Sequence, residues 1–124
     1  MGKRILVVED QEDNRRILRD LLTSVGYEVI EAVTGEEGVA LAETGHPDLI
    51  LMDIQLPGID GYEATRRIRA HPALRQVPII AVTSYALSGD DVKAMEAGCN
   101  DYIPKPYSPR ALLAKIRQYL PQNI

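Results

Sequence analysis

Short apolar runs alternate with segments of helical periodicity along the whole chain, and this alternation strongly constrains the fold. The runs predicted as strands lie at residues 5–8, 28–32, 49–52, 79–82 and 102–103. Three of these runs are apolar at every position, which is typical of parallel strands buried on both faces. The sequence therefore predicts an α/β fold built around a parallel sheet.

The segments between the strands have the spacing and the terminal residues of helices. Helices are predicted at residues 14–25, 36–44, 61–70, 89–97 and 109–120. An acidic residue follows three positions after each of Thr34, Asp60 and Ser88, as in a capping box, and Ser108 precedes a proline suited to a first helical turn. Because crossovers between parallel strands are right-handed, helices should cover both faces of the sheet. Periodicity alone leaves the two common doubly wound strand orders open.

Length and composition indicate one ordinary globular domain over residues 1–124. The single cysteine, Cys99, excludes an internal disulfide and gives no sign of an oxidising compartment. A net charge of −4 and the lack of any nucleic-acid-binding motif argue against a nucleic-acid partner. No apolar stretch approaches the roughly 20 residues that span a bilayer, and the Met1-Gly2-Lys3-Arg4 start does not have the apolar segment and cleavage site typical of a signal peptide. We therefore expect a cytoplasmic protein without membrane contact.

Polar residues gather where the predicted strands end. They are Glu9-Asp10 after the first strand, Asp53 after the third, Thr83-Ser84 after the fourth and Lys105-Pro106 just past the fifth. Because the carboxyl ends of parallel strands meet at one edge of the sheet, these residues should lie close together. Each of these four elements alone has an ordinary explanation as a helix cap or a turn. Their combination at the ends of four strands indicates a functional site.

The residue types in this set suit phosphoryl chemistry with a divalent cation. Two unit charges about 4 Å apart repel by roughly 4 kcal/mol at an effective dielectric of 20, so neighbouring carboxylates need a cation. Oxygen ligands without His or Cys favour Mg²⁺. A hydroxyl from Thr83 and the ammonium of Lys105 suit phosphoryl oxygens, and the Asp53 carboxylate can form an acyl phosphate.

With these motifs, the chain resembles the receiver domain of bacterial two-component response regulators of the CheY type. The matching residues are Val7-Val8-Glu9-Asp10, Leu51-Met52-Asp53, Leu56-Pro57-Gly58-Ile59-Asp60-Gly61, Ala81-Val82-Thr83-Ser84, Ala97-Gly98 and Lys105-Pro106. The match covers essentially the whole chain. It implies a flavodoxin-like, doubly wound (βα)5 sandwich whose five parallel strands have the order 2-1-3-4-5.

The resemblance also implies a role for each residue of the site. Asp53 would be the phosphoacceptor, and Mg²⁺ (or Mn²⁺) would be held by Asp53, Asp10, Glu9 and the backbone carbonyl of Gln55. The remaining expected roles are phosphoryl binding by Thr83, Ser84 and Lys105, switching by Thr83 and Tyr102, tuning of the acyl-phosphate lifetime by Gln55 and Tyr85, and a cis bond between Lys105 and Pro106.

The partners that the resemblance implies are proteins. A histidine kinase or a histidine phosphotransfer protein would donate the phosphoryl group, docking near Asn14, Arg15 and Leu18. A downstream protein would bind the face formed by the helix at 89–97, the strand at 102–103 and the last helix. A homodimer is a further possible partner arrangement. The Met1-Gly2 start favours a free-standing protein over a receiver module excised from a hybrid histidine kinase or multidomain regulator.

Three other classes of protein fit the residues less well. A magnesium-dependent phosphohydrolase with an aspartyl nucleophile usually has a second Asp two positions later, where this chain has Gln55. A flavodoxin-like cofactor binder would need a glycine-rich loop after the first strand, where this chain is acidic. A degenerate receiver that serves only for interaction would not need the intact set. We therefore expect a signalling switch and not an enzyme, apart from its own phosphorylation and dephosphorylation.

Overall fold

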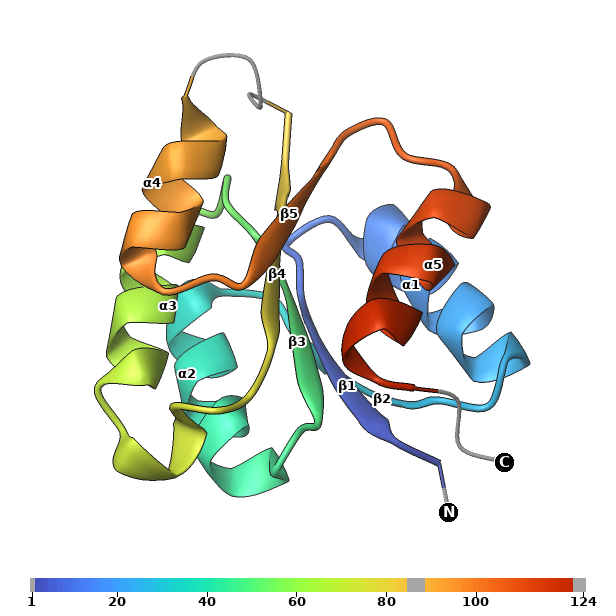
Figure 1. The fold of residues 1–124 in the computed structure, drawn as a ribbon, viewed down its shortest axis with the longest axis horizontal. Coiled ribbons are helices and arrows are strands. Elements are labelled where there is room, and N and C mark those ends of the chain that lie inside the picture. Colours follow the sequence, from blue (N-terminus) through green and yellow to red (C-terminus); the bar gives the residue numbers. More distant parts are fainter. Residues whose placement is uncertain (1, 85–88, 122–124) are drawn as a thin grey trace.

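Five parallel strands form the central sheet of the computed structural model, which describes residues 2–84 and 89–121 (Figure 1). The strands are β1 (Arg4–Val8), β2 (Glu28–Ala32), β3 (Leu49–Asp53), β4 (Ile79–Thr83) and β5 (Asp101–Pro104). Their order across the sheet is β2-β1-β3-β4-β5, and every neighbouring pair is parallel. This confirms the predicted α/β class and the order that the family resemblance implied.

Helices cover both faces of the sheet, as Figure 1 shows. They are α1 (Glu12–Ser24), α2 (Gly35–Gly45), α3 (Gly61–Arg69), α4 (Asp90–Ala97) and α5 (Pro109–Tyr119), with a short 3-10 turn, η1 (Pro72–Leu74), after α3. Helices α1 and α5 pack on one face, and α2, α3 and α4 pack on the other. In the described part of the chain, no helix has both the length and the apolar character that crossing a membrane requires.

The core is divided by the sheet into two apolar layers. Along β1, Leu6 and Val8 point into the layer under α2, α3 and α4, whereas Ile5 and Val7 point into the layer under α1 and α5. Strands β3 and β4 are buried at every position, while the edge strand β2 is only half-buried. This burial explains why the inner strands have no polar alternation.

Side-chain caps begin several helices as the sequence predicted. The side-chain oxygens of Thr34, Asp60 and Ser108 accept hydrogen bonds from the backbone N–H groups three residues later, at 3.0, 2.9 and 3.0 Å. The predicted cap at Ser88 lies outside the described residues. Each cap satisfies a backbone donor that has no partner inside the helix.

Several helix boundaries differ from the prediction by one or two residues. Helix α1 begins at Glu12, two residues earlier than predicted, and Gly45 belongs to α2 although we expected it to end that helix. His46, with φ of 50°, takes the left-handed position instead. A Cβ atom at Gly45 would lie 2.6 Å from Ile30 Cδ1, the end of a flexible side chain.

Candidate functional site

Three carboxylates meet at the carboxyl ends of β1 and β3. Asp53 is the last residue of β3, and Glu9 follows β1 directly, beside it, because Val8 pairs with Met52 across the two strands. Asp10 comes next, and one carboxylate oxygen of each acid lies within 4.8 Å of the others. Glu9 and Asp53 are only 3% and 4% exposed. The sheet topology therefore brings these predicted residues together, as the strand-end argument required.

Lys105 brings a positive charge to this acidic cluster. Its Nζ lies 3.3 Å from Asp53 Oδ2 and 3.5 Å from Glu9 Oε1. Its backbone N–H donates to the carbonyl oxygen of Thr83 at 2.7 Å, and its peptide bond to Pro106 is cis. The loop after β5 is thereby fixed to the end of β4, which holds the lysine over the carboxylates.

Two backbone N–H groups hold the buried carboxylates from the other side. Gln11 N donates to Glu9 Oε2 at 2.9 Å, and Gln55 N donates to Asp53 Oδ1 at 3.1 Å. Each donor lies two residues after the acid that it binds, so the local turn and the side chain fix one another. Both carboxylates are therefore oriented by the backbone of the protein itself.

The electrostatics of the site favour a cation. Burial raises the pKa of Glu9 and the Asp53 charge raises it further, against the opposing effects of the Gln11 N–H and Lys105. Burial and the charges of Glu9 and Asp53 raise the pKa of Tyr107 to about 12. Among the described residues, three carboxylates thus face one close ammonium. An oxygen-only donor set with excess negative charge fits a magnesium site.

This electrostatic arrangement predicts a pH effect in chelator. Because the pKa of folded Glu9 lies above its ordinary value of 4.5, its contribution to stability is full below pH 4.5 and is lost as the pH rises through the folded pKa. As the pH rises from 4.5 through the folded pKa of Glu9, we expect the free energy of unfolding of Glu9→Gln to increase relative to that of the wild type. Above that pH, the difference in free energy should stay constant. Denaturant unfolding of both proteins between pH 4 and 7.5 measures this, and parallel curves would contradict it.

The other predicted site residues lie around the carboxylates. Thr83, the last residue of β4, is fully buried, whereas Ser84 is exposed at the rim. Tyr102 is half-buried in β5, pairs with Ala81 and packs against the layer under α2, α3 and α4. Gln55 lies two residues past Asp53, where its backbone N–H binds the Asp53 carboxylate. Tyr85, predicted to tune the acyl-phosphate lifetime, lies outside the described residues.

A cleft of about 460 Å³ opens beside the carboxylates. Glu9, Ser84 and Lys105 line it on the polar side, and Ile17 and Tyr107 belong to its apolar wall. Ile17 is 60% exposed and contributes apolar surface to the cleft. Neither Ile17 nor Tyr107 was predicted to belong to the site. The sequence signal that could have identified Tyr107 is its position two residues after Lys105.

The fold and the acidic cluster together are those of a receiver domain, and comparison with known proteins agrees. Residues 5–117 match the family model of the response regulator receiver domain. The chain belongs to this family, whose members are receivers of two-component signalling.

Individual relatives match over nearly the whole chain. The polar-differentiation response regulator DivK of Brucella ovis is 44% identical over 120 residues, which are 97% of this chain and 98% of the relative. A receiver domain of a Pseudomonas aeruginosa sensor histidine kinase, solved with magnesium coordinated in its active-site cleft, is 42% identical with a TM-score of 0.91, covering 98% and 100% of the two chains. CheY4 of Vibrio cholerae has 25% identity and a TM-score of 0.91, over 96% and 99%.

Proposed function

We propose that this protein is a phosphorylation-controlled switch in which Asp53 accepts a phosphoryl group from a histidine kinase or a histidine phosphotransfer protein. The observation that carries the proposal is the buried Asp53 carboxylate, which lies among Glu9, Asp10 and Lys105 beside an open cleft. The Gln55 N–H fixes the orientation of this carboxylate in advance, and a cation would offset the excess negative charge around it.

The transfer requires alignment more than covalent machinery. An Asp53 carboxylate oxygen would form the new bond to phosphorus, while the bond to the donor imidazole breaks and its electron pair leaves with that imidazole. Gln55 N holds Asp53 Oδ1, and Lys105 Nζ, which is 3.3 Å from Oδ2, is placed to pair with the phosphoryl oxygens. Glu9 and Asp10 with the Gln55 carbonyl would hold Mg²⁺, which supplies positive charge to the transferring group.

The Pseudomonas relative supports magnesium as the natural ion, because its active-site cleft holds magnesium and its sequence is 42% identical to this chain. Mn²⁺ prefers the same oxygen ligands and should occupy the same position. In this proposal the protein works in the cytoplasm and turns over no other substrate.

The phosphoryl group would act by shifting populations between two conformations of the protein. Thr83 and Ser84, at the end of β4, would bind the new oxygens, and Tyr102 on the neighbouring strand would respond to the movement of Thr83. The face formed by α4, β5 and α5 would carry the signal. Val92 and Met95 of α4, which are 57% and 50% exposed, support a protein partner or a second copy at this face.

Intact-mass measurement tests the proposal directly. After incubation with a small-molecule phosphodonor and Mg²⁺, the wild-type protein should gain the mass of one phosphoryl group, and Asp53→Asn should gain none. Asp60→Asn is a suitable control because it keeps an oxygen for the cap of α3. An absent adduct, or an adduct that persists in Asp53→Asn, would refute the phosphoacceptor assignment.

A further inference from the structure

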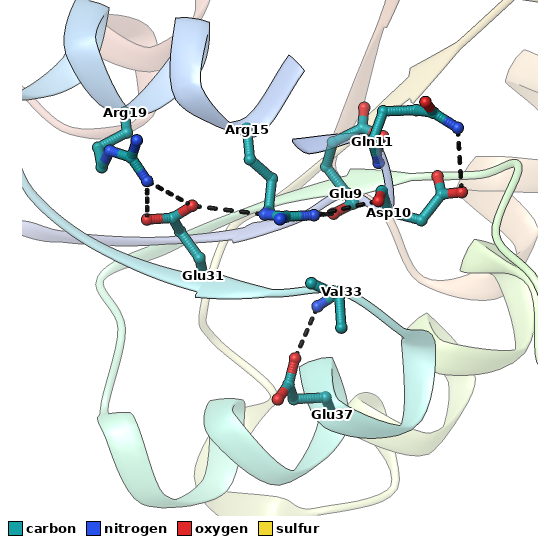
Figure 2. A network of polar contacts seen from close by, with 8 residues as sticks. All are labelled: Glu9, Asp10, Gln11, Arg15, Arg19, Glu31, Val33 and Glu37. Carbon is teal, nitrogen blue, oxygen red and sulfur yellow. Dashed lines mark hydrogen bonds and ion pairs between the residues drawn. The ribbon is translucent and has the colours of Figure 1, made fainter. Parts of the chain in front are cut away.

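One guanidinium group binds the backbone on both sides of Asp10. Arg15 Nη1 donates to the carbonyl oxygen of Glu9 at 2.9 Å and to the carbonyl oxygen of Asp10 at 3.1 Å (Figure 2). These two oxygens belong to the peptide groups that precede and follow the Asp10 Cα atom. Holding both peptide planes fixes the backbone dihedral angles of Asp10 and so the direction in which its side chain leaves the backbone.

Asp10 has weaker local support than its neighbour Glu9. Glu9 is held by its backbone N–H on the Ala32 carbonyl, at 3.0 Å, and by the bond from Gln11 N to its carboxylate. The Asp10 carboxylate has a 3.4 Å contact with Gln11 Nε2, which is long and exposed. Its direction therefore depends mainly on its backbone, which Arg15 holds.

Arg15 is itself held by an acid from the edge strand. Glu31 of β2 places Oε1 3.5 Å from Arg15 Nε, and its two oxygens also accept from Arg19 Nη1 at 3.1 and 2.9 Å (Figure 2). The Arg15 side chain is only 14% exposed. Because ion pairs that are partly buried are less screened by solvent, this contact restrains the guanidinium more than a surface pair would.

The Glu31 carboxylate also matters for charge. A guanidinium beside a cation site repels the cation, and an adjacent carboxylate offsets this repulsion. Glu31 therefore reduces the repulsion between the Arg15 guanidinium and a bound divalent ion. The hydrogen bonds from Arg15 to the Glu9 and Asp10 carbonyl oxygens stay in place. A planar group with several fixed donors suits this task better than a lysine ammonium.

We propose that Arg15 is a positioning residue for the divalent-cation site, holding the Glu9–Asp10 backbone in the conformation that binds the ion, and that Glu31 keeps Arg15 in place. The inference rests on the proposed function, since it requires the acidic cluster to bind a cation. A purely structural role for Arg15, in which it only ties α1 to the sheet, predicts a different result. In that case removing Arg15 would lower stability and leave the cation affinity unchanged.

Cation affinity measured without phosphorylation tests this role. Electron paramagnetic resonance of free Mn²⁺ during titration gives the dissociation constant for the wild type, Arg15→Met and Arg15→Lys. We expect Arg15→Met to bind Mn²⁺ about tenfold to a hundredfold more weakly, as is usual when a group that orients metal ligands is removed. Arg15→Lys should recover part of the loss. Arg16→Met, at a neighbouring arginine that is 59% exposed, is the matched control and should bind like the wild type.

The outcomes separate failure of this inference from failure of the proposed function. Absent Mn²⁺ binding by the wild type, or equal binding by Asp10→Asn, would refute the cation site itself. Wild-type affinity in a folded Arg15→Met, with folding checked by melting in chelator, would refute the positioning role alone. If Arg15→Met does not fold, Glu31→Gln replaces it: a severalfold weaker affinity supports the inference, and an unchanged affinity overturns it.

Discussion

Mg²⁺ is expected to raise the melting temperature of the wild-type protein, and Asp53→Asn is expected to raise it in chelator while greatly reducing the response to Mg²⁺. The ion binds only the assembled carboxylates, so it stabilises the folded state by about 2.7 kcal/mol at a concentration one hundred times its dissociation constant. For a domain of 124 residues that corresponds to a shift of roughly 10 °C.

The effect of Asp53→Asn in chelator follows from the charges around it. Asn retains the oxygen that accepts from Gln55 N but removes a charge repelled by Glu9 and Asp10 and attracted by Lys105. Two repulsions against one attraction leave a net gain on the order of 1 kcal/mol, after allowance for a high effective dielectric.

Thermal melts in chelator and in Mg²⁺ measure both effects. Asp13→Asn is the control for removing one negative charge, because the Asp13 side chain is 83% exposed and lies outside the site. It should keep the full response to Mg²⁺ and change stability little. Asp53→Asn melting below the wild type in chelator would show that the Lys105 ion pair outweighs the repulsion.

Gly61→Ala is expected to destabilise the protein by about 2–3 kcal/mol and to weaken phosphoryl uptake on Asp53. A Cβ atom at Gly61 would lie 2.4 Å from the carbonyl oxygen of Asp53 and 2.7 Å from Ile54 Cα. Both contacts are with backbone, so relief requires movement of the strand end that carries the phosphoacceptor. The hydrogen bond from Gly61 N to the Ile54 carbonyl, at 3.0 Å, would be strained by the same movement.

Gly45→Ala is the matched control, since it also replaces a helical glycine by alanine. Its new Cβ would meet only Ile30 Cδ1, the end of a flexible side chain, at 2.6 Å. We expect a change within about 1 kcal/mol, because rotation of Ile30 and the better helix propensity of alanine partly offset the contact. Chemical denaturation together with the intact-mass assay compares the two variants. Equal stability of Gly61→Ala and Gly45→Ala would contradict the prediction.

Much of the fold could be predicted from local pattern. Apolar runs marked the buried strands, and the Thr34, Asp60 and Ser108 caps marked three helix starts, because these signals depend on residues close together in the chain. Strand order could not be obtained this way, since it depends on pairing between distant segments, and it came from family resemblance. The predicted end of α2 was wrong by one residue, because His46, with φ of 50°, takes the left-handed position at the end of the helix that we expected Gly45 to take.

The candidate site divides in the same way. The sequence alone placed Glu9, Asp10, Asp53 and Lys105 at strand ends, and parallel-sheet geometry then required them to converge. The contacts of Arg15 with Glu31, and the place of Tyr107 beside the carboxylates, needed the tertiary structure. Arg15 and Glu31 are 16 residues apart, on a helix and an edge strand, and no local sequence pattern pairs them. Residue types thus determined which chemistry is available, whereas non-local packing decided which neighbours hold it in place.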